Sequence, residues 1–360
     1  MFETGFDECE NKIKNGRSLM SQADNKSTSR IKAKLWGVRG SLPAPLTPEA
    51  LQNQMKKVLS DYQSWCALDS SVGNSRDIDV FLSSLPRHRS LGYGGNTPCF
   101  EVVSDHQRII VDGGSGIRLL GYELMKGPCG KGQGRVDLLF THFHWDHLIG
   151  LPFFAPLFIP GNQIHLYSVQ PELQVVFQAL FRKPFFPVEL ENLGAQLFYH
   201  QLEPRRPVEF GDLRVTPYEL DHPDPCWGYK FEKGGRALAY CVDTECKRVS
   251  RDDLGLDLPL YQGVDTMIFD AQYTIMESLE KVNWGHATAS LGLDIAMREG
   301  IRRVIFVHHD PASSSEKIAA AENQAREYYN QQLKRAETER GAPLSSVEWF
   351  FGYEGMTLEV

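Results

Sequence analysis

The segment LLFTHFHWDHL, residues 138–148, constrains this chain more than any other part of its sequence. His142, His144, Asp146 and His147 lie within six residues and directly follow an apolar run that is typical of a buried strand. In an extended segment His142 and His144 point to the same side, and imidazole nitrogens and carboxylate oxygens suit zinc, manganese or iron. Because the whole chain has only 11 histidines, this clustering indicates a metal site rather than a polar loop that happens to be rich in histidine.

Three other apolar runs end in residues of the same kind. These residues are Asp221 and His222 after residues 213–220, Asp243 after residues 237–242, and His308, His309 and Asp310 after residues 303–307. Because strand ends can lie side by side in a sheet, we expect these side chains to converge with the histidine cluster at one edge.

The number of these residues predicts how many ions they hold. A single metal ion needs about three protein ligands plus water. The strand ends offer more than twice that number, which is enough for two ions about 3.5–4 Å apart. Two such cations need anionic ligands, which Asp146 and Asp243 supply, and Asp243 is the expected bridge between them.

Composition excludes several classes of protein. The chain has 360 residues with 42% apolar and 23% charged residues, as an ordinary globular protein has. Lys and Arg number 38 against 46 for Asp and Glu, and the resulting net charge of −8 does not favour coating by nucleic acid. No apolar run reaches the ~18 residues of a membrane span, the first residues are no secretory signal, and 7 scattered cysteines without a CxxC pair suit a reducing cytoplasm. We therefore expect a cytoplasmic protein without a membrane partner.

The order of patterns along the chain predicts one large α/β domain over residues 31–360. Residues 1–30 are polar and are expected to form a flexible tail. A helical insertion is expected at about 46–90, where Thr47 can cap a helix that starts at Pro48. The insertion could serve as a lid, as a contact in a homo-oligomer or as surface decoration.

Short β-like runs recur along the rest of the domain. They cover residues 31–38, 99–103, 108–112, 136–140, 163–167, 213–220, 237–242, 266–270 and 303–307. Helical patterns start at Pro171 and cover 287–298 and 315–339, and the last residues, VEWFFGYEGMTLEV, predict a terminal hairpin.

These residues carry a resemblance to a known family. HFHWDH is similar to the HxHxDH signature of the metallo-β-lactamase superfamily, and the later strand-end residues follow in that family's order. The resemblance implies an αββα sandwich with a dinuclear site at one edge, where Asp243 bridges the ions. It implies two sets of further ligands, which are His142, His144 and His222 for the first metal and Asp146, His147 and His308 for the second. The choice of His308 over His309 rests on the strand-then-histidine pattern.

Further segments resemble one branch of that superfamily, the ribonuclease Z-like and cyclic phosphodiesterase-like proteins. These segments are WGVRGSLPAP, YGGNTPCFEV, IIVDGGSGIRLLG, and IFDAQY followed by WGHATASLGLDIA. In that branch a histidine lies near the scissile phosphate and an acidic residue steers it. The matching residues here are His286 and Asp270.

The position of His286 supports the same role on physical grounds. His286 directly precedes a predicted helix, whose free N–H groups and positive dipole end favour an anion. A histidine there can donate to a phosphate oxygen or protonate a leaving alkoxide, and Asp270 can fix its tautomer. The alternative is that His286 only caps the helix or is solvated.

Three weaker features remain open. Asp112 is expected to support the metal loop without binding metal itself. Asn96 and Thr97 in the glycine-rich loop either reach the edge of the site and bind substrate or form a plain turn. A group of phenylalanines after the metal loop either stacks a base or, as is commoner, belongs to the core, and these residues are Phe153, Phe154, Phe158, Phe185 and Phe186.

The sequence predicts a dinuclear metal-dependent hydrolase. Its two divalent ions are expected to be zinc, and manganese, iron and nickel are the alternatives. The expected reaction is attack of a metal-bridging hydroxide on a small or cyclic nucleotide-type phosphodiester, with Asp146 orienting the nucleophile and His286 assisting the leaving oxygen. The chain lacks the glycine- and basic-rich arm typical of ribonuclease Z, so large structured RNA is not expected as a partner. The main alternative is hydrolysis of a carboxylic ester, thioester, lactone or β-lactam. A di-iron oxidoreductase and a non-catalytic metal-binding module are weaker alternatives.

Overall fold

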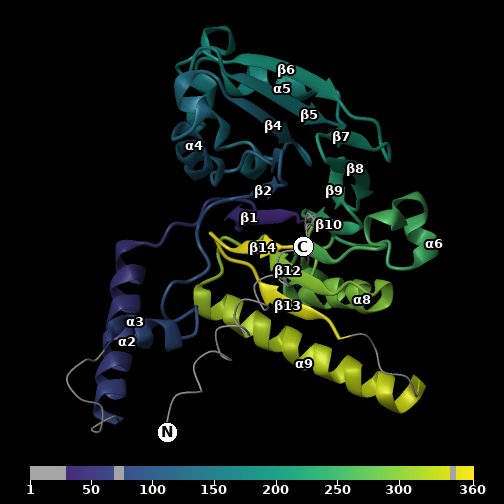
Figure 1. Ribbon diagram of the computed structural model, residues 1–360. Helices are drawn as coiled ribbons and strands as arrows, with labels where there is room; N and C mark the ends of the chain where they lie inside the picture. Colours follow the sequence, from purple (N-terminus) through teal and green to yellow (C-terminus); the bar gives the residue numbers. More distant parts are fainter. Residues whose placement is uncertain (1–29, 69–76, 341–345) are drawn as a thin grey trace, which may run out of the picture.

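Two β-sheets pack face to face through the apolar residues that alternate along their strands, and helices cover the outer face of each sheet (Figure 1). The structure is a computed structural model that describes residues 30–68, 77–340 and 346–360. This arrangement confirms the predicted α/β class and the αββα sandwich. The predicted flexible tail, except for Arg30, lies outside the described residues.

Each sheet contains seven of the described strands. The first sheet has the order β14 (Thr357–Glu359), β1 (Lys32–Gly37), β2 (Cys99–Val103), β3 (Arg108–Val111), β4 (Arg135–Leu139), β5 (Gln163–Ser168) and β6 (Gln196–Gln201). The second sheet has the order β13 (Glu348–Phe351), β12 (Arg303–Val307), β11 (Thr266–Asp270), β10 (Arg236–Cys241), β9 (Cys226–Lys233), β8 (Leu213–Leu220) and β7 (Val208–Phe210). All predicted strands are present, whereas the sequence patterns missed β6, β7 and β9.

Strand direction brings the functional residues together. In the first sheet β3, β4, β5 and β6 run parallel. In the second sheet β10, β11, β12 and β13 run parallel, and β8 points the same way because β9 is antiparallel to both of its neighbours. The strands that end in ligand-type residues therefore present their carboxyl ends together in each sheet.

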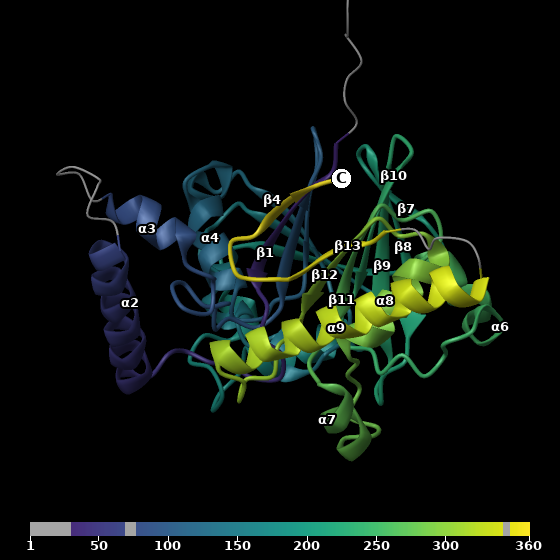
Figure 2. The same ribbon diagram turned by 90° about the horizontal axis from the view of Figure 1, so that it is seen from below.

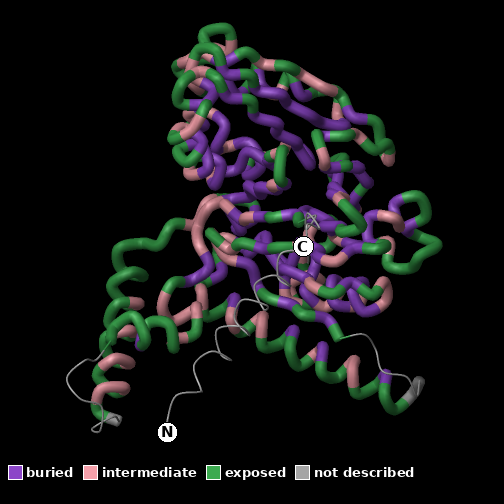
Figure 3. Tube along the Cα trace, viewed as in Figure 1, coloured by how far each residue is buried: buried purple, intermediate pink, exposed green. Residues whose placement is uncertain are grey.

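The space between the sheets is filled by a continuous cluster of buried apolar side chains. Phe100 of the first sheet stacks on Tyr240 of the second, with ring centroids 4.9 Å apart. Buried residues follow the strands of both sheets, whereas residues 48–67, beside the sheets, are largely exposed (Figure 3). This shared core fixes the two sheets, and with them their strand ends, relative to each other.

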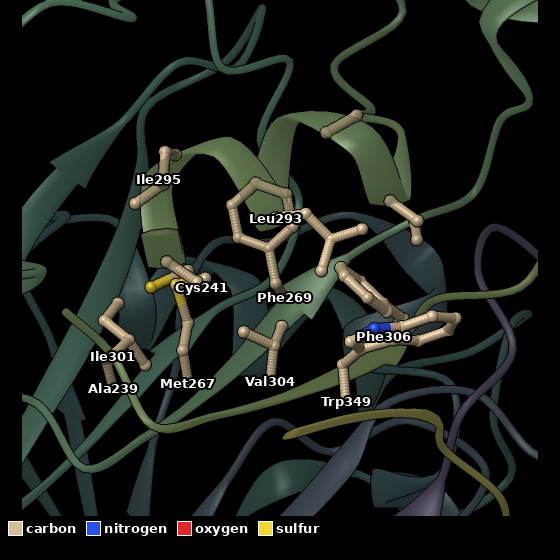
Figure 4. Close-up of a cluster of buried hydrophobic side chains, with 14 of the residues drawn as sticks. Ala239, Cys241, Met267, Phe269, Leu293, Ile295, Ile301, Val304, Phe306 and Trp349 are labelled. Carbon is tan, nitrogen blue, oxygen red and sulfur yellow. The ribbon is translucent and has the colours of Figure 1, made fainter. Parts of the chain in front are cut away.

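The outer helices bury one apolar face each. On the first sheet lie α4 (Ile117–Met125) and α5 (Leu173–Leu180), and on the second lie α6 (Arg251–Leu254), α8 (Ala289–Glu299) and α9 (Ser315–Arg340). Beneath α8, Leu293 packs with Phe269, Phe306 and Trp349 of the sheet (Figure 4). Short 3₁₀ turns complete the connections, at Pro128–Lys131, Trp145–His147, Leu151–Phe153, Ala155–Phe158, Leu190–Asn192 and Gly255–Leu260.

The helical insertion forms α2 (Pro48–Leu68) and α3 (Ile78–Ser84), which stand beside the two sheets (Figure 2). The hydroxyl of Thr47 accepts the backbone N–H of Ala50, and the carboxylate of Asp77 caps α3. The apolar face expected to be buried is instead largely exposed, with Leu51, Met55 and Leu59 about half accessible. Residues 69–76 lie outside the described part of the chain.

The prediction of a terminal hairpin is wrong. β13 pairs with β12 in the second sheet, and β14 pairs with β1 in the first. Trp349 and Phe351 are buried beneath the helices of the second sheet, whereas Leu358 is buried between the sheets. Because the two strands bury their side chains in different clusters, the turn at Gly352–Gly355 crosses from one sheet to the other.

Among the described helices, none combines the length and the apolar character that crossing a bilayer requires.

Replacement of Ile305 tests the core between the sheets. Ile305 lies in the middle of β12 and is fully buried. We expect Ile305→Ala to lower the free energy of unfolding by about 2–5 kcal/mol and Ile305→Val by about 0.5–1.5 kcal/mol, because each leaves a cavity that the two sheets cannot close. Urea unfolding followed by circular dichroism measures this. Gln163→Ala, at an exposed position of β5, is the control. If it lowered the free energy of unfolding as much as Ile305→Ala does, Ile305 would not be part of the core between the sheets.

Candidate metal centre

The loop after β4 supplies the central part of the site. The chain is extended from Thr141 to His144 and then forms a 3₁₀ turn at Trp145–His147. This turn brings His147 back toward His142, and the two ring centroids lie 4.3 Å apart. His142, Asp146 and His147 are buried, whereas His144 remains half-exposed.

The predicted first ligand set is brought together. His142, His144 and His222 each offer one ligand atom, and these atoms lie within 4.8 Å of one another. Burial lowers the pKa of His222, and burial together with the charge of His147 holds the pKa of His142 well below its ordinary value. Both imidazoles are therefore neutral, as metal ligands must be.

The predicted second ligand set is brought together as well. Ligand atoms of Asp146, His147 and His308 lie within 4.8 Å of one another. The Nε2 atom of His308 lies 3.2 Å from Asp146 Oδ2, and the Nε2 atom of His147 lies 3.3 Å from the same oxygen. These contacts join the loop after β4 to the end of β12 in the other sheet.

Asp243 lies between the two sets. One of its oxygens is 2.6 Å from His147 Nε2, and the other is 3.3 Å from His308 Nε2. One ligand atom each of Asp243, His142 and His147 also lie within 4.8 Å of one another. This position, shared between both histidine sets, is the one expected of a bridging carboxylate.

The electrostatics of the site favour positive charge. Burial opposes ionisation of Asp146 and Asp243, but neighbouring histidines outweigh it and hold the pKa of both carboxyls well below the ordinary value. Burial lowers the pKa of His308, but Asp243, Asp146 and Asp270 outweigh it and raise that pKa to about 9. The pKa of His147 is raised well above its ordinary value for the same reason.

The residues fit divalent cations. The Nε2 atoms of His142 and His222 are buried and have no hydrogen-bond partner among the described residues. Leaving a buried polar nitrogen without a partner costs about 1–3 kcal/mol. The donor set of imidazoles and carboxylates is the one that zinc, manganese and iron accept in proteins.

Backbone strain is concentrated at this site. Asp112, Asp243 and His308 have φ angles of +65°, +63° and +66°. Residues other than glycine rarely adopt this left-handed backbone region. Each of these residues comes shortly after a buried strand, and each left-handed conformation costs about 1–3 kcal/mol of free energy. The sheet interior therefore holds these side chains in place against a local energetic preference.

His286 and Asp270 form a pair next to the second ligand set. The Nδ1 atom of His286 lies 2.9 Å from Asp270 Oδ2 and 3.4 Å from Asp243 Oδ1. Asp270 ends β11, and His286 lies two residues before Thr288, whose hydroxyl accepts the backbone N–H of Leu291 as the N-cap of α8. The helix is thus capped by Thr288 and not by His286.

A shell of hydrogen bonds supports the ligands. Asp112 accepts the backbone N–H and hydroxyl of Thr141 at 2.9 and 3.0 Å and lies 2.9 Å from His147 Nδ1, so it contacts the metal loop as expected. The sequence analysis missed two members. The backbone N–H of Ser41 donates to Asp146 at 2.8 Å, and Asp224 lies 2.8 Å from His144 Nε2. Neither belongs to a recognisable spacing, although Asp224 lies only two residues after His222.

His309 lies outside the cluster. Its Nε2 donates to the backbone oxygen of Gly352 at 2.8 Å, and its ring stacks on Phe351. Burial lowers the pKa of His309 to about 3. Of the two adjacent histidines, the structure thus brings only His308 to the other candidate ligands.

Asn96 and Thr97 form hydrogen bonds with residues outside the cluster. Asn96 donates to Glu354 at 3.0 Å and accepts the hydroxyl of Ser115. Thr97 is fully buried, and its hydroxyl accepts the backbone N–H of Ser115 at 2.8 Å. These bonds are those of a structural turn that joins neighbouring loops.

The phenylalanines after the metal loop divide into two kinds. Phe154 is fully buried in the core beneath α4 and α5, and Phe158 and Phe186 are partly buried against it. Phe153 and Phe185 are mostly exposed. The core interpretation thus accounts for three of the five residues.

The profile of the Beta-lactamase superfamily domain matches residues 107–309, more than half of the chain. The chain therefore belongs to the beta-lactamase superfamily. This membership confirms the predicted superfamily and agrees with the two-sheet fold and the cluster of histidines and aspartates.

Individual relatives match over parts of the chain. Ribonuclease Z of Thermococcus kodakarensis is 31% identical over 106 residues, which cover 28% of this chain and 32% of the relative. Ribonuclease BN of Escherichia coli is 22% identical over 231 residues, which cover 49% of this chain and 71% of the relative. The chain thus spans only about a third of the length of the first of these relatives. The solved structure of the metallo-beta-lactamase fold protein YhfI from Bacillus subtilis shares the fold, with a TM-score of 0.57 at 15% identity, covering 92% of this chain and 100% of that one.

The two adjacent histidines provide a matched test of metal binding. We expect His308→Ala to reduce the number of divalent ions that remain on the purified protein. The reason is that ligand atoms of His308, Asp146 and His147 lie within 4.8 Å of one another and could hold one ion together. His309→Gln keeps a donor for Gly352 and should retain the full metal content. Inductively coupled plasma mass spectrometry measures both. If His309→Gln lost metal while His308→Ala kept all of it, His309 and not His308 would be the metal ligand.

Burial of neutral His309 predicts a dependence of stability on pH. Its pKa is about 3 in the folded chain against an ordinary 6.5, so between these values the unfolded chain binds a proton that the folded chain does not. Stability is therefore lost as pH falls through this range, by up to about 1.4 kcal/mol per pH unit from this residue. We expect urea unfolding of metal-free His309→Gln to show a shallower loss than that of the wild type. Identical pH slopes for the two proteins would contradict a buried neutral His309.

Proposed function

We propose that this chain is a phosphodiesterase with a dinuclear metal centre that acts on small or cyclic nucleotide-type phosphodiesters. The observation that carries the proposal is the His286–Asp270 pair, 2.9 Å apart, which lies beside Asp243 and His308. A histidine in this position can donate a proton to the alkoxide oxygen that leaves phosphorus.

Zinc is the ion that we propose first, and manganese, iron and nickel are the alternatives that the same ligands accept. Two divalent ions held by the two ligand sets and Asp243 would supply charge neutralisation for the phosphoryl oxygens and a water of lowered pKa.

The residues of the chain itself orient the reacting groups. The backbone N–H of Ser41 donates to the carboxylate of Asp146 and holds it where it can orient the attacking water. Asp270 engages Nδ1 of His286, which leaves Nε2 as the nitrogen that faces a ligand. His286 then gives its Nε2 proton to the leaving oxygen as the phosphorus–oxygen bond breaks.

Two further observations support phosphorus chemistry on a small substrate. The relatives in the comparison are named ribonucleases, and ribonucleases break phosphodiester bonds. The net charge of −8 and the mixed charges along α2 do not favour binding of large structured RNA.

A substrate panel tests the proposal. We expect the metal-loaded protein to hydrolyse bis(4-nitrophenyl) phosphate and 2′,3′- or 3′,5′-cyclic nucleotides much faster than 4-nitrophenyl acetate, a homoserine lactone or a chromogenic cephalosporin. Liberated nitrophenol and chromatography of the products measure the rates. Turnover of the lactone or the β-lactam with no turnover of any phosphodiester would establish the alternative, hydrolysis at carbon.

His286 separates chemistry from metal binding. We expect His286→Ala to lower kcat for the phosphodiester by about 10²–10⁴-fold while the metal content stays normal, because a general acid is lost and the ligand sets remain. Asp270→Asn should also lower kcat, since its amide holds the wrong tautomer of His286. Full activity in His286→Ala would remove this residue from the mechanism.

A further inference from the structure

A groove of about 1000 Å³ opens beside the metal centre and shares His144 and Asp224 with it. It crosses the carboxyl ends of β5 and β6, which stand next to β4 in the first sheet. Ligands of α/β proteins commonly bind at the carboxyl ends of parallel strands. The groove is therefore placed to receive the part of a substrate that extends away from the reacting phosphate.

The floor of the groove is apolar and partly aromatic. Val169, Leu202 and Trp227 are buried there, and Phe143 lies partly exposed in the wall. Such a floor suits a flat ring, because aromatic and aliphatic surfaces gain from covering it.

Two polar atoms in this lining have no hydrogen-bond partner among the described residues. They are the indole Nε1 of Trp227, whose side chain is more than nine-tenths buried, and the amide oxygen of Gln170. The amide nitrogen of Gln170 donates to the carbonyl oxygen of Pro225 at 2.8 Å. Because that carbonyl can only accept, the orientation of the amide is fixed and its oxygen remains as a free acceptor. The groove thus holds one unused donor and one unused acceptor.

The rim of the groove is acidic. Glu172, Glu203 and Asp224 line it, and its lining contains no Lys or Arg. Arg206 lies 2.7 Å from Glu203 and compensates that carboxylate, so Glu172 and Asp224 supply the remaining negative charge that a second phosphate would meet. An uncharged ring that carries a hydrogen-bond acceptor and a hydrogen-bond donor suits this lining better than a second anion does.

We propose that this groove is a nucleobase subsite, in which Trp227 donates to and Gln170 accepts from the pairing edge of the base. Every nucleobase carries a donor and an acceptor side by side on that edge, and enzymes that hold a single base use stacking together with such bonds. The inference rests on the proposed phosphodiesterase activity and adds to it that the substrate is a mononucleoside diester. Both atoms lie beneath the groove surface, so a base reaches them only when the lining moves locally.

Three chromogenic diesters with the same leaving group test the subsite. They are thymidine 5′-(4-nitrophenyl) phosphate, bis(4-nitrophenyl) phosphate and 4-nitrophenyl phosphorylcholine. We expect the metal-loaded wild type to show the highest kcat/KM for the thymidine ester. A highest value for the choline ester would overturn the proposal in favour of a cation held by the acidic rim, and equal values for all three would leave the groove without a role.

Two variants connect the preference to the unused atoms. We expect Trp227→Phe and Gln170→Leu each to lower kcat/KM for the thymidine ester by roughly three- to tenfold, the usual effect of one hydrogen bond between neutral groups. Activity on bis(4-nitrophenyl) phosphate should change less than twofold, which also shows that each variant is folded. Gln201→Leu is the matched control, because Gln201 lines the same groove and already donates to the oxygen of Val169. An equal loss on both substrates, or an equal loss in Gln201→Leu, would contradict the subsite.

Direct binding separates failure of the subsite from failure of the proposed activity. Isothermal titration of the metal-loaded protein compares thymidine 5′-monophosphate with ribose 5-phosphate. Tighter binding of the nucleotide that is lost in Gln170→Leu, without turnover of any diester, would keep the subsite and refute the phosphodiesterase. Turnover of diesters with equal binding of both ligands would keep the activity and refute the subsite.

Discussion

Burial of the carboxylates of Asp146 and Asp243 where the two sheets meet is the constraint on which the rest of the structure depends. A buried carboxylate without compensation costs several kcal/mol, so imidazoles from separate strand ends surround both. The raised pKa values of His147 and His308 express the same attraction, because the pocket favours positive charge. Divalent cations would satisfy that demand and would also give partners to the buried nitrogens of His142 and His222, which have none within the described residues.

The second constraint is that the ligands stand at strand ends in strained backbone conformations. The left-handed φ angles of Asp112, Asp243 and His308 would relax in a flexible loop. They persist because the strands before them are buried between the sheets and because hydrogen bonds such as those from Thr141 to Asp112 fix the side chains. The stability of the sandwich is thus what keeps the ligands within reach of one another.

The chemistry around the centre is divided between two sides. The His286–Asp270 pair comes from the second sheet and the segment before α8, close to Asp243 and His308. The groove lies across the ends of β5 and β6 in the first sheet and is joined to the centre by His144 and Asp224. In the function proposed here, different elements would contact the leaving oxygen and the remainder of the substrate, so activity and preference could be altered separately.

The sequence alone determined the features that are local or periodic. The spacing of His142 to His147, the alternation of the strands and the positions of His222, Asp243 and His308 after apolar runs predicted a large α/β domain and the convergence of these residues. The sandwich was predicted from the resemblance of these motifs to a known family. Only the tertiary structure decided that His308 faces the cluster while His309 contacts Gly352, that Asp224 and Ser41 support the ligands, and that β13 and β14 join different sheets. The physical reason is that periodicity encodes which side of a strand is buried, whereas the choice of neighbour for an edge strand or a loop side chain depends on contacts between residues far apart in the chain.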